Sequence, residues 1–188
     1  MPITINGSGT ITGLSDGGLG LSGADMPAGA VIQVVSVEKS DTNSSTGNSW
    51  ADTGLTASIT PTSSSNKILV MCDYICGAAN NGYGQMQMVR TISGTDVVLN
   101  KGDTSGSRTP SLSSRFYYAS YGSTYDGIHE SSQFLDTPNT TSAVTYKLQF
   151  RSNLSSGHTV YINRNGNDSD RGEDPRTASH INLLEIKV

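Results

Sequence analysis

The stretch Val144-Thr145-Tyr146-Lys147-Leu148-Gln149-Phe150-Arg151 decides the fold class, because apolar and polar side chains alternate along it without interruption. A period of two sends the four apolar side chains to one face of a β-strand and the four polar ones to the other. The stretch therefore predicts a half-buried strand, with one face on a core and the other toward water.

Outward from this stretch, the period of two recurs along the chain. Residues 66–76 are apolar on both faces, which predicts an inner strand of a sheet, or a strand whose outer face is covered by a neighbouring subunit. Further strands are predicted at 31–37, 55–59, 83–92, 96–100, 115–121, 128–135, 159–163 and 178–188. Turn residues separate them at 43–48, 61–65, 80–82, 101–110, 138–139 and 165–175. The turn residues Ser155-Ser156-Gly157 predict a hairpin between 144–151 and 159–163.

Many short strands without any helical period predict an all-β chain. The spacing of strands and turns favours a two-sheet antiparallel sandwich of jelly-roll type over residues 31–188. The two cysteines, Cys72 and Cys76, fall on one face of the predicted inner strand, where we expect buried free thiols.

Residues 1–30 differ from the rest of the chain, because their apolar residues stand alone between glycines. Such a pattern cannot build a core and suits an extended arm that lays its apolar side chains on another protein. The predicted docking residues are Ile3, Ile5, Ile11, Leu14, Leu19 and Leu21.

Composition excludes several classes of function. Only 15% of the 188 residues are charged, the net charge is −4, and the 12 Lys and Arg residues are scattered. A nucleic-acid-binding surface needs clustered basic residues. No stretch approaches the ~18 apolar residues of a membrane span, and the N-terminus has neither the basic start nor the apolar run of a secretory signal. We therefore expect no nucleic-acid or membrane partner, and synthesis in the cytoplasm.

No motif for catalysis is found, so we expect a non-enzymatic protein without cofactors or catalytic residues. One loop, 165–174, is dense in oxygen ligands that can hold Ca²⁺. Its spacing does not match a twelve-residue calcium loop, and Arg171 places a positive charge inside it. A solvated acidic loop is the preferred interpretation, and a calcium site is the alternative. The candidate ligands are Asp168, Asp170, Glu173 and Asp174.

A group of tyrosines is open to two interpretations, a subunit interface or a platform for carbohydrate. Alternation over 116–121 sends two aromatic side chains to one face and two to the other, so one face is left for a partner. The interface is the preferred interpretation. The candidate residues are Tyr83, Tyr117, Tyr121 and Tyr125.

The opening segment, Pro2-Ile3-Thr4-Ile5-Asn6-Gly7-Ser8-Gly9-Thr10-Ile11-Thr12-Gly13-Leu14, resembles the N-termini of tail-fibre and decoration proteins of tailed bacteriophages. Blocks at 29–35, 52–61 with 65–70, and 146–151 with 161–164 carry the same resemblance. Members of these groups are typically homotrimeric β-sandwich knobs, and the resemblance supplies no catalytic residues.

The resemblance implies a homotrimeric capsid decoration (cement) protein on the virion surface, made in the host cytoplasm. Its arm would dock on the major capsid protein or another virion protein. The alternative is a short tail or head fibre whose β knob binds a host receptor or a host surface glycan.

Overall fold

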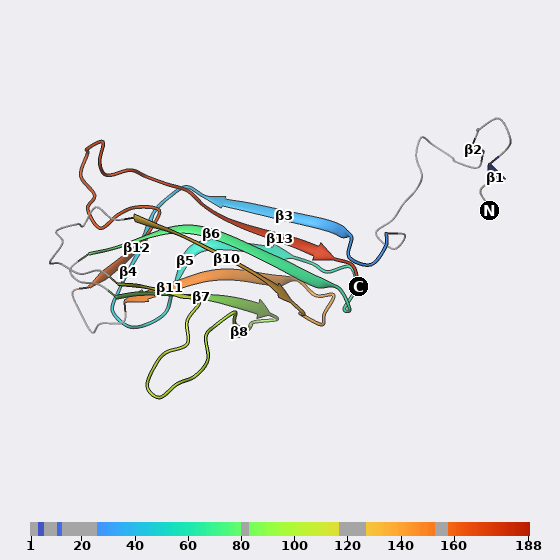
Figure 1. Cartoon of the computed structure of the whole chain (residues 1–188), viewed down its shortest axis with the longest axis horizontal. Coiled ribbons are helices and arrows are strands. Elements are labelled where there is room, and N and C mark those ends of the chain that lie inside the picture. Colours follow the sequence, from blue (N-terminus) through green and yellow to red (C-terminus); the bar gives the residue numbers. More distant parts are fainter. Residues whose placement is uncertain (1–3, 6–10, 13–25, 80–82, 117–126, 153–157) are drawn as a thin grey trace.

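The computed structural model describes residues 4–5, 11–12, 26–79, 83–116, 127–152 and 158–188. Over these residues the chain forms thirteen β-strands, which make two packed antiparallel sheets and one separate two-stranded pair (Figure 1). The predicted all-β sandwich is confirmed. No helix in the described part of the chain is long and apolar enough to cross a membrane.

The first sheet is built around the longest strand, β6 (Lys67–Ala79). Strand β10 (Gly127–Asp136) pairs with one edge of β6 over ten residues. Strands β13 (Ser179–Ile186) and β12 (Thr159–Ile162) follow one another along the other edge. Beyond them, β3 (Val31–Lys39) pairs with β13, and β4 (Asn43–Thr46) pairs with β12. The six strands therefore occupy four rows.

The second sheet has β11 (Val144–Ser152) between β5 (Ala51–Ile59) and β7 (Tyr83–Ile92). Strands β8 (Thr95–Leu99) and β9 (Ser113–Phe116) follow one another along the far edge of β7. This sheet also has four rows.

The order of the rows identifies the topology. Numbered along the chain, with each collinear pair counted as one row, the first sheet reads 1-8-3-6 and the second reads 2-7-4-5. The chain therefore changes sheet at every connection between these rows except the tight β7–β8 turn at Ser93-Gly94. This order is that of a jelly roll, as the sequence predicts.

The core lies between the two sheets. In β11 all four apolar side chains of the opening stretch are fully buried, which confirms the prediction made from their alternation. They face the inner side of β6, where Ile68 and Val70 are also fully buried. Cys72 and Cys76 are free and buried on this side, and burial raises the pKa of the Cys72 thiol to about 12. An unreactive structural role for Cys72 follows, because the thiolate is the reactive form.

Two local predictions are wrong. Strands β11 and β12 lie in different sheets, so the connection between them is a crossover and not a hairpin. Residues 43–46 form strand β4 instead of a turn, because β12 supplies a pairing partner for this Asn-Ser-Ser-Thr segment. Tertiary pairing here overrides weak strand propensity. The predicted strand 115–121 is described only to Phe116, and the structure places the start of β9 two residues earlier.

A partly buried ion pair joins the two sheets. The Arg90 guanidinium on β7 donates to both carboxylate oxygens of Asp136 at the end of β10, at 2.7 and 2.9 Å. The Tyr146 hydroxyl on β11 donates to the same carboxylate at 2.7 Å. Burial and this hydrogen bond raise the pKa of Tyr146, so the hydroxyl keeps its proton.

The N-terminal strands β1 (Thr4–Ile5) and β2 (Ile11–Thr12) pair with each other, Ile5 opposite Ile11. They form a sheet of their own, which Figure 1 shows apart from the sandwich. The division into an arm, 1–30, and a sandwich domain, 31–188, remains a prediction.

Candidate functional site

An apolar row crosses the outer face of the first sheet, the face that points away from the core. Strand register places Leu184 opposite Val34 on one side and Leu69 on the other, and Leu69 opposite Leu135. Cross-strand partners present their side chains on the same face. Val34 is 60% exposed and Leu135 is 50% exposed. We call these four residues the apolar row.

Each residue of the apolar row is half of an adjacent apolar pair in its strand. The pairs are Val34-Val35, Leu69-Val70, Phe134-Leu135 and Leu183-Leu184. Because successive side chains of a strand point to opposite faces, one member of each pair enters the core and the other points outward. Of these four strands, only β6 was predicted from the sequence to be apolar on both faces. The other three strands also contain an adjacent apolar pair in the sequence. Only the structure shows that the strand register aligns these pairs.

The outer face becomes polar and then charged toward its other end. The next line of cross-strand neighbours on this face consists of Ser36, Asn182, Met71 and Gln133. The row after it places Glu38, His180 and Asp73 side by side. A shallow hollow of about 400 Å³ lies against Met71, Asp73 and Asn182. The side chains of this face thus change along the strands from apolar to polar and then charged.

His180 is the titratable centre of the charged row. Its Nδ1 lies 3.0 Å from a carboxylate oxygen of Asp73, and its Nε2 lies 3.5 Å from Glu38. The hydrogen bond to Asp73 is the main reason why the pKa of His180 is raised, and the charge of Glu38 adds to it. The imidazole is therefore held in its charged form to higher pH than a free histidine.

The apolar end of this face is also the end where the N-terminal segment joins the sandwich. The backbone N–H of Gly29 donates to the carbonyl of Lys187 at 2.8 Å, and the N–H of Lys187 donates to the carbonyl of Ala30 at 2.9 Å. Close by in the chain, the fully buried carboxylate of Glu185 accepts hydrogen bonds from Thr62 and Asn66 at 2.7–2.8 Å. Residues 29–30 are therefore hydrogen-bonded to the end of strand β13.

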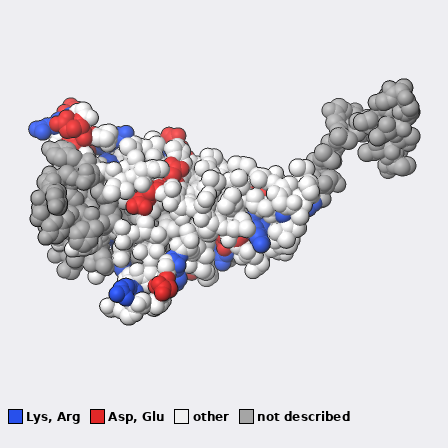
Figure 2. All heavy atoms as spheres, in the orientation of Figure 1, with Lys and Arg blue, Asp and Glu red and all other residues white. Residues whose placement is uncertain are grey.

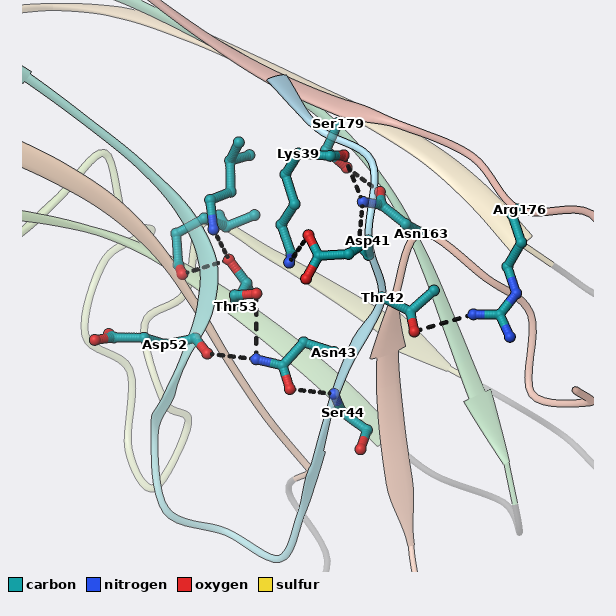
Figure 3. Close-up of polar contacts among 12 residues, drawn as sticks. Lys39, Asp41, Thr42, Asn43, Ser44, Asp52, Thr53, Asn163, Arg176 and Ser179 are labelled. Carbon is teal, nitrogen blue, oxygen red and sulfur yellow. Dashed lines mark hydrogen bonds and ion pairs between the residues drawn. The ribbon is translucent and has the colours of Figure 1, made fainter. Parts of the chain in front are cut away.

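At the opposite end of the sheet, the side chain of Asn163 bonds to Lys39, Asp41 and Ser179 (Figure 3). Its amide nitrogen donates to the carbonyls of Lys39 and Asp41 at 2.7 and 2.9 Å, and its amide oxygen accepts from the Ser179 hydroxyl at 2.5 Å. Its backbone N–H donates to Ile75, and its carbonyl accepts from Thr177. The residue has a left-handed φ of 64°, which asparagine tolerates better than most residues. Asn163 therefore links the residues between β3 and β4 to the residues between β12 and β13.

The second of these breaks is the loop 163–178, which carries the calcium alternative. Asp174 accepts hydrogen bonds from the side-chain amides of Asn165 and Asn167, both at 2.9 Å. Asp168 pairs with Arg176, and with Arg164 at 3.6 Å. Figure 2 shows red and blue atoms together at upper left, where Figure 1 places this loop. Asp170 and Glu173 are exposed.

In the described part of the chain, no three His, Cys, Asp or Glu side chains group closely enough to hold a metal ion. The calcium site therefore stays a prediction that only a metal titration would test.

Only part of the predicted arm and tyrosine sites falls within the described residues. Ile5 and Ile11 pair across β1 and β2, while Ile3, Leu14, Leu19 and Leu21 lie outside. Tyr83 begins β7, half-buried, opposite Phe116 of β9. Tyr117, Tyr121 and Tyr125 lie outside the described residues. Both site predictions remain predictions.

Comparisons with known proteins give the chain no family. No protein-family model matches it, and no curated protein matches its sequence. Among solved structures, the chain is similar to a structure of the infectious bursal disease virus Gx strain, with 9% identity and a TM-score of 0.40. It is also similar to the crystal structure of that virus's VP2 subviral particle, with 10% identity and a TM-score of 0.39.

These comparisons cover most of this chain, 82% and 83%, but only 42% and 37% of the viral chains. The chain thus spans about two fifths of their length. At these scores the likeness carries no argument about function.

Proposed function

We propose that this chain is a non-enzymatic structural protein of a bacteriophage virion surface, a homotrimeric capsid decoration protein that docks through its N-terminal arm. The observation that carries the proposal is the apolar row, which lies at the end of the sandwich where the arm begins. A contiguous exposed apolar patch on a soluble domain marks an interaction site more often than isolated apolar residues do.

The occupant that we propose for the apolar row is a second copy of the chain. Four strands at ~4.8 Å spacing make the apolar row roughly 20 Å wide, and one outward residue per strand makes it about 7 Å deep, about 140 Å². A standard interface buries about 800 Å² per partner. The row would therefore supply only the apolar centre of a subunit contact, with the surrounding polar face completing it, and the arm remains available for a different virion protein.

The fold and the N-terminal resemblance support the same proposal. Jelly rolls are common in viral capsid and lectin domains. The segment 2–14 carries the likeness to phage decoration and fibre proteins. A short fibre is the second candidate, and copy number separates the two. Quantitative mass spectrometry of purified virions should find hundreds of copies for a decoration protein and a few dozen or fewer for a fibre.

Light scattering of the purified full chain over a range of concentrations tests the trimer and its interface. We expect a mass approaching three times the 19.7 kDa of one chain, lost in Val34→Asp. Val97→Asp is the matched control, because Val97 is also exposed, at 41%, but lies on β8 of the other sheet. A monomer at every concentration contradicts the homotrimer. A trimer that persists in Val34→Asp contradicts the role of the apolar row.

Deletion of residues 1–25 tests the docking arm. We expect the truncated chain to fold and to be missing from virions, because the sandwich has its own core. Normal incorporation of the truncated protein would show that docking does not depend on the arm.

A further inference from the structure

The outer face of the first sheet holds the charged row as well as the apolar row, and its dimensions decide how far a subunit contact extends. Strand β6 begins at Lys67 and β10 ends at Asp136, so the face ends within a few residues of Leu69 and Leu135. A face about 20 Å wide supplies about 800 Å² only if the contact runs roughly 40 Å along the strands. Asp73 is four residues from Leu69, roughly 13 Å. A contact of standard size centred on the apolar row therefore covers the charged row.

Two histidines flank one carboxylate in this part of the face. Asp73 of β6 has an oxygen 3.0 Å from the Nδ1 of His180 and 3.9 Å from the Nε2 of His129 on β10. On the other side of the His180 ring, the Nε2 lies 3.5 Å from Glu38 of β3. We call these four residues the histidine cluster. Their side chains are 37–61% exposed, so water screens their charges in the single chain.

Within the described residues, few other charged groups face the histidine cluster. Glu130 of β10 belongs to the opposite face of its strand. In the loop after β12, Arg164 pairs with Asp168 and shares a pocket lining with Glu173, beyond the cluster. Lys67 begins β6 at the other end of the face. The protonation of the two histidines therefore sets the charge of this part of the face.

The charge of the histidine cluster changes with pH in one direction. Two carboxylates give −2 when both imidazoles are neutral, and the sum is zero when both are protonated. A subunit that covers the cluster excludes water, and a net charge of −2 costs more to bury than a compensated one. In the single chain the pKa of His180 is already raised, mainly by its hydrogen bond to Asp73. Covering the cluster raises the pKa further, so association takes up protons and is favoured as the pH falls.

We propose that the subunit contact covers the charged row together with the apolar row, and that protonation of His180 and His129 strengthens it. This pH response rests on the proposed function, because it needs a second copy of the chain on the apolar row. An assembly of this kind holds in mildly acidic solution and loosens in mildly alkaline solution.

Sedimentation equilibrium of the full chain at constant ionic strength, from about pH 5.5 to about pH 8.5, tests this response. We expect the association constant to rise about tenfold or more toward acidic pH, since one proton taken up per contact gives up to about tenfold per pH unit. The double variant His129→Gln with His180→Gln should lose that dependence. His158→Gln is the matched control and should keep it, because His158 precedes β12 and lies outside the charged row.

An association constant that does not change with pH overturns the pH response but leaves the homotrimer of the proposed function standing. So does a pH dependence that survives in the folded double variant. A chain that is monomeric at every pH overturns both. Val34→Asp should abolish association over the whole range, and pH-dependent association in that variant would overturn a contact shared by the two rows. If His180→Gln impairs folding, His129→Gln alone, at a side chain 61% exposed, should still reduce the pH dependence.

Discussion

Replacement of Asn163 by alanine should strongly destabilise the sandwich, because this one side chain makes three buried or half-buried hydrogen bonds. Truncation to alanine removes the hydrogen bonds that this side chain makes with the carbonyls of Lys39 and Asp41 and with the hydroxyl of Ser179. At about 1 kcal/mol net for each bond, the loss is about 3 kcal/mol. Alanine at a left-handed φ costs roughly 1 kcal/mol more. We expect the free energy of unfolding to fall by about 4 kcal/mol, the sum of these terms.

Urea unfolding followed by circular dichroism measures this change at a fixed protein concentration. In a domain of this size, 4 kcal/mol corresponds to a fall in Tm of roughly 10 °C. Asn139→Ala is the matched control, since Asn139 has a similar φ of 54° but is exposed. In Asn139→Ala the free energy of unfolding should fall only by the cost of alanine at a left-handed φ, roughly 1 kcal/mol. Asn163→Gly separates the two terms further, because glycine adopts the left-handed conformation without strain.

Equal losses in Asn163→Ala and Asn139→Ala would refute the reasoning, since the side-chain bonds would then contribute nothing. An Asn163→Gly variant clearly less stable than Asn163→Ala would refute the backbone term alone.

Three further predictions concern the same sandwich. Gly77→Ala should destabilise it by about 2 kcal/mol or more, because the Arg164 backbone has to move, and unchanged urea unfolding would contradict that close contact. Asp136→Ala should cost about 3 kcal/mol, because the largely buried Arg90 loses its carboxylate and the Tyr146 hydroxyl loses its acceptor, whereas a loss below about 1 kcal/mol would mean that the ion pair is dispensable. The raised pKa of His180 means that its stabilising contribution is complete below a pH of about 6.5 and lost as pH rises through the folded-state pKa. As the pH rises from acidic to mildly alkaline, the Tm should therefore fall more in the wild type than in His180→Gln. Parallel curves of Tm against pH for the two proteins would contradict a stabilising role of charged His180.

The sequence was most informative where one strand carried a complete pattern. The alternation from Val144 to Phe150 predicts both the strand and its buried face, because a period of two depends on local geometry alone. The apolar character of 66–76 predicts an inner strand for the same reason. The turn predicted from composition at 43–46 is wrong. This polar segment forms a strand because it pairs with β12, and such pairing cannot be recognised from the segment itself.

The candidate sites depend on information that no single segment contains. The apolar row combines four doublets whose alignment requires the register of four strands. The loop 163–178 folds back over Gly77, and only the three-dimensional structure shows that contact. The sequence predicts Asn163 only as the last residue of the strand 159–163. Its role follows from segments distant in sequence that meet at its side chain.

The apolar row and the loop 163–178 lie at opposite ends of one sheet, and that separation has a consequence for mutagenesis. Leu69 in the apolar row and Ile75, whose carbonyl accepts the backbone hydrogen bond of Asn163, are six residues apart on β6, roughly 20 Å at ~3.3 Å per residue. Substitutions farther apart than about 10 Å without shared partners usually have additive effects on stability. We therefore expect Val34→Asp to change self-association without weakening the hydrogen bonds of Asn163, and Asn163→Ala to lower the free energy of unfolding without altering the apolar row.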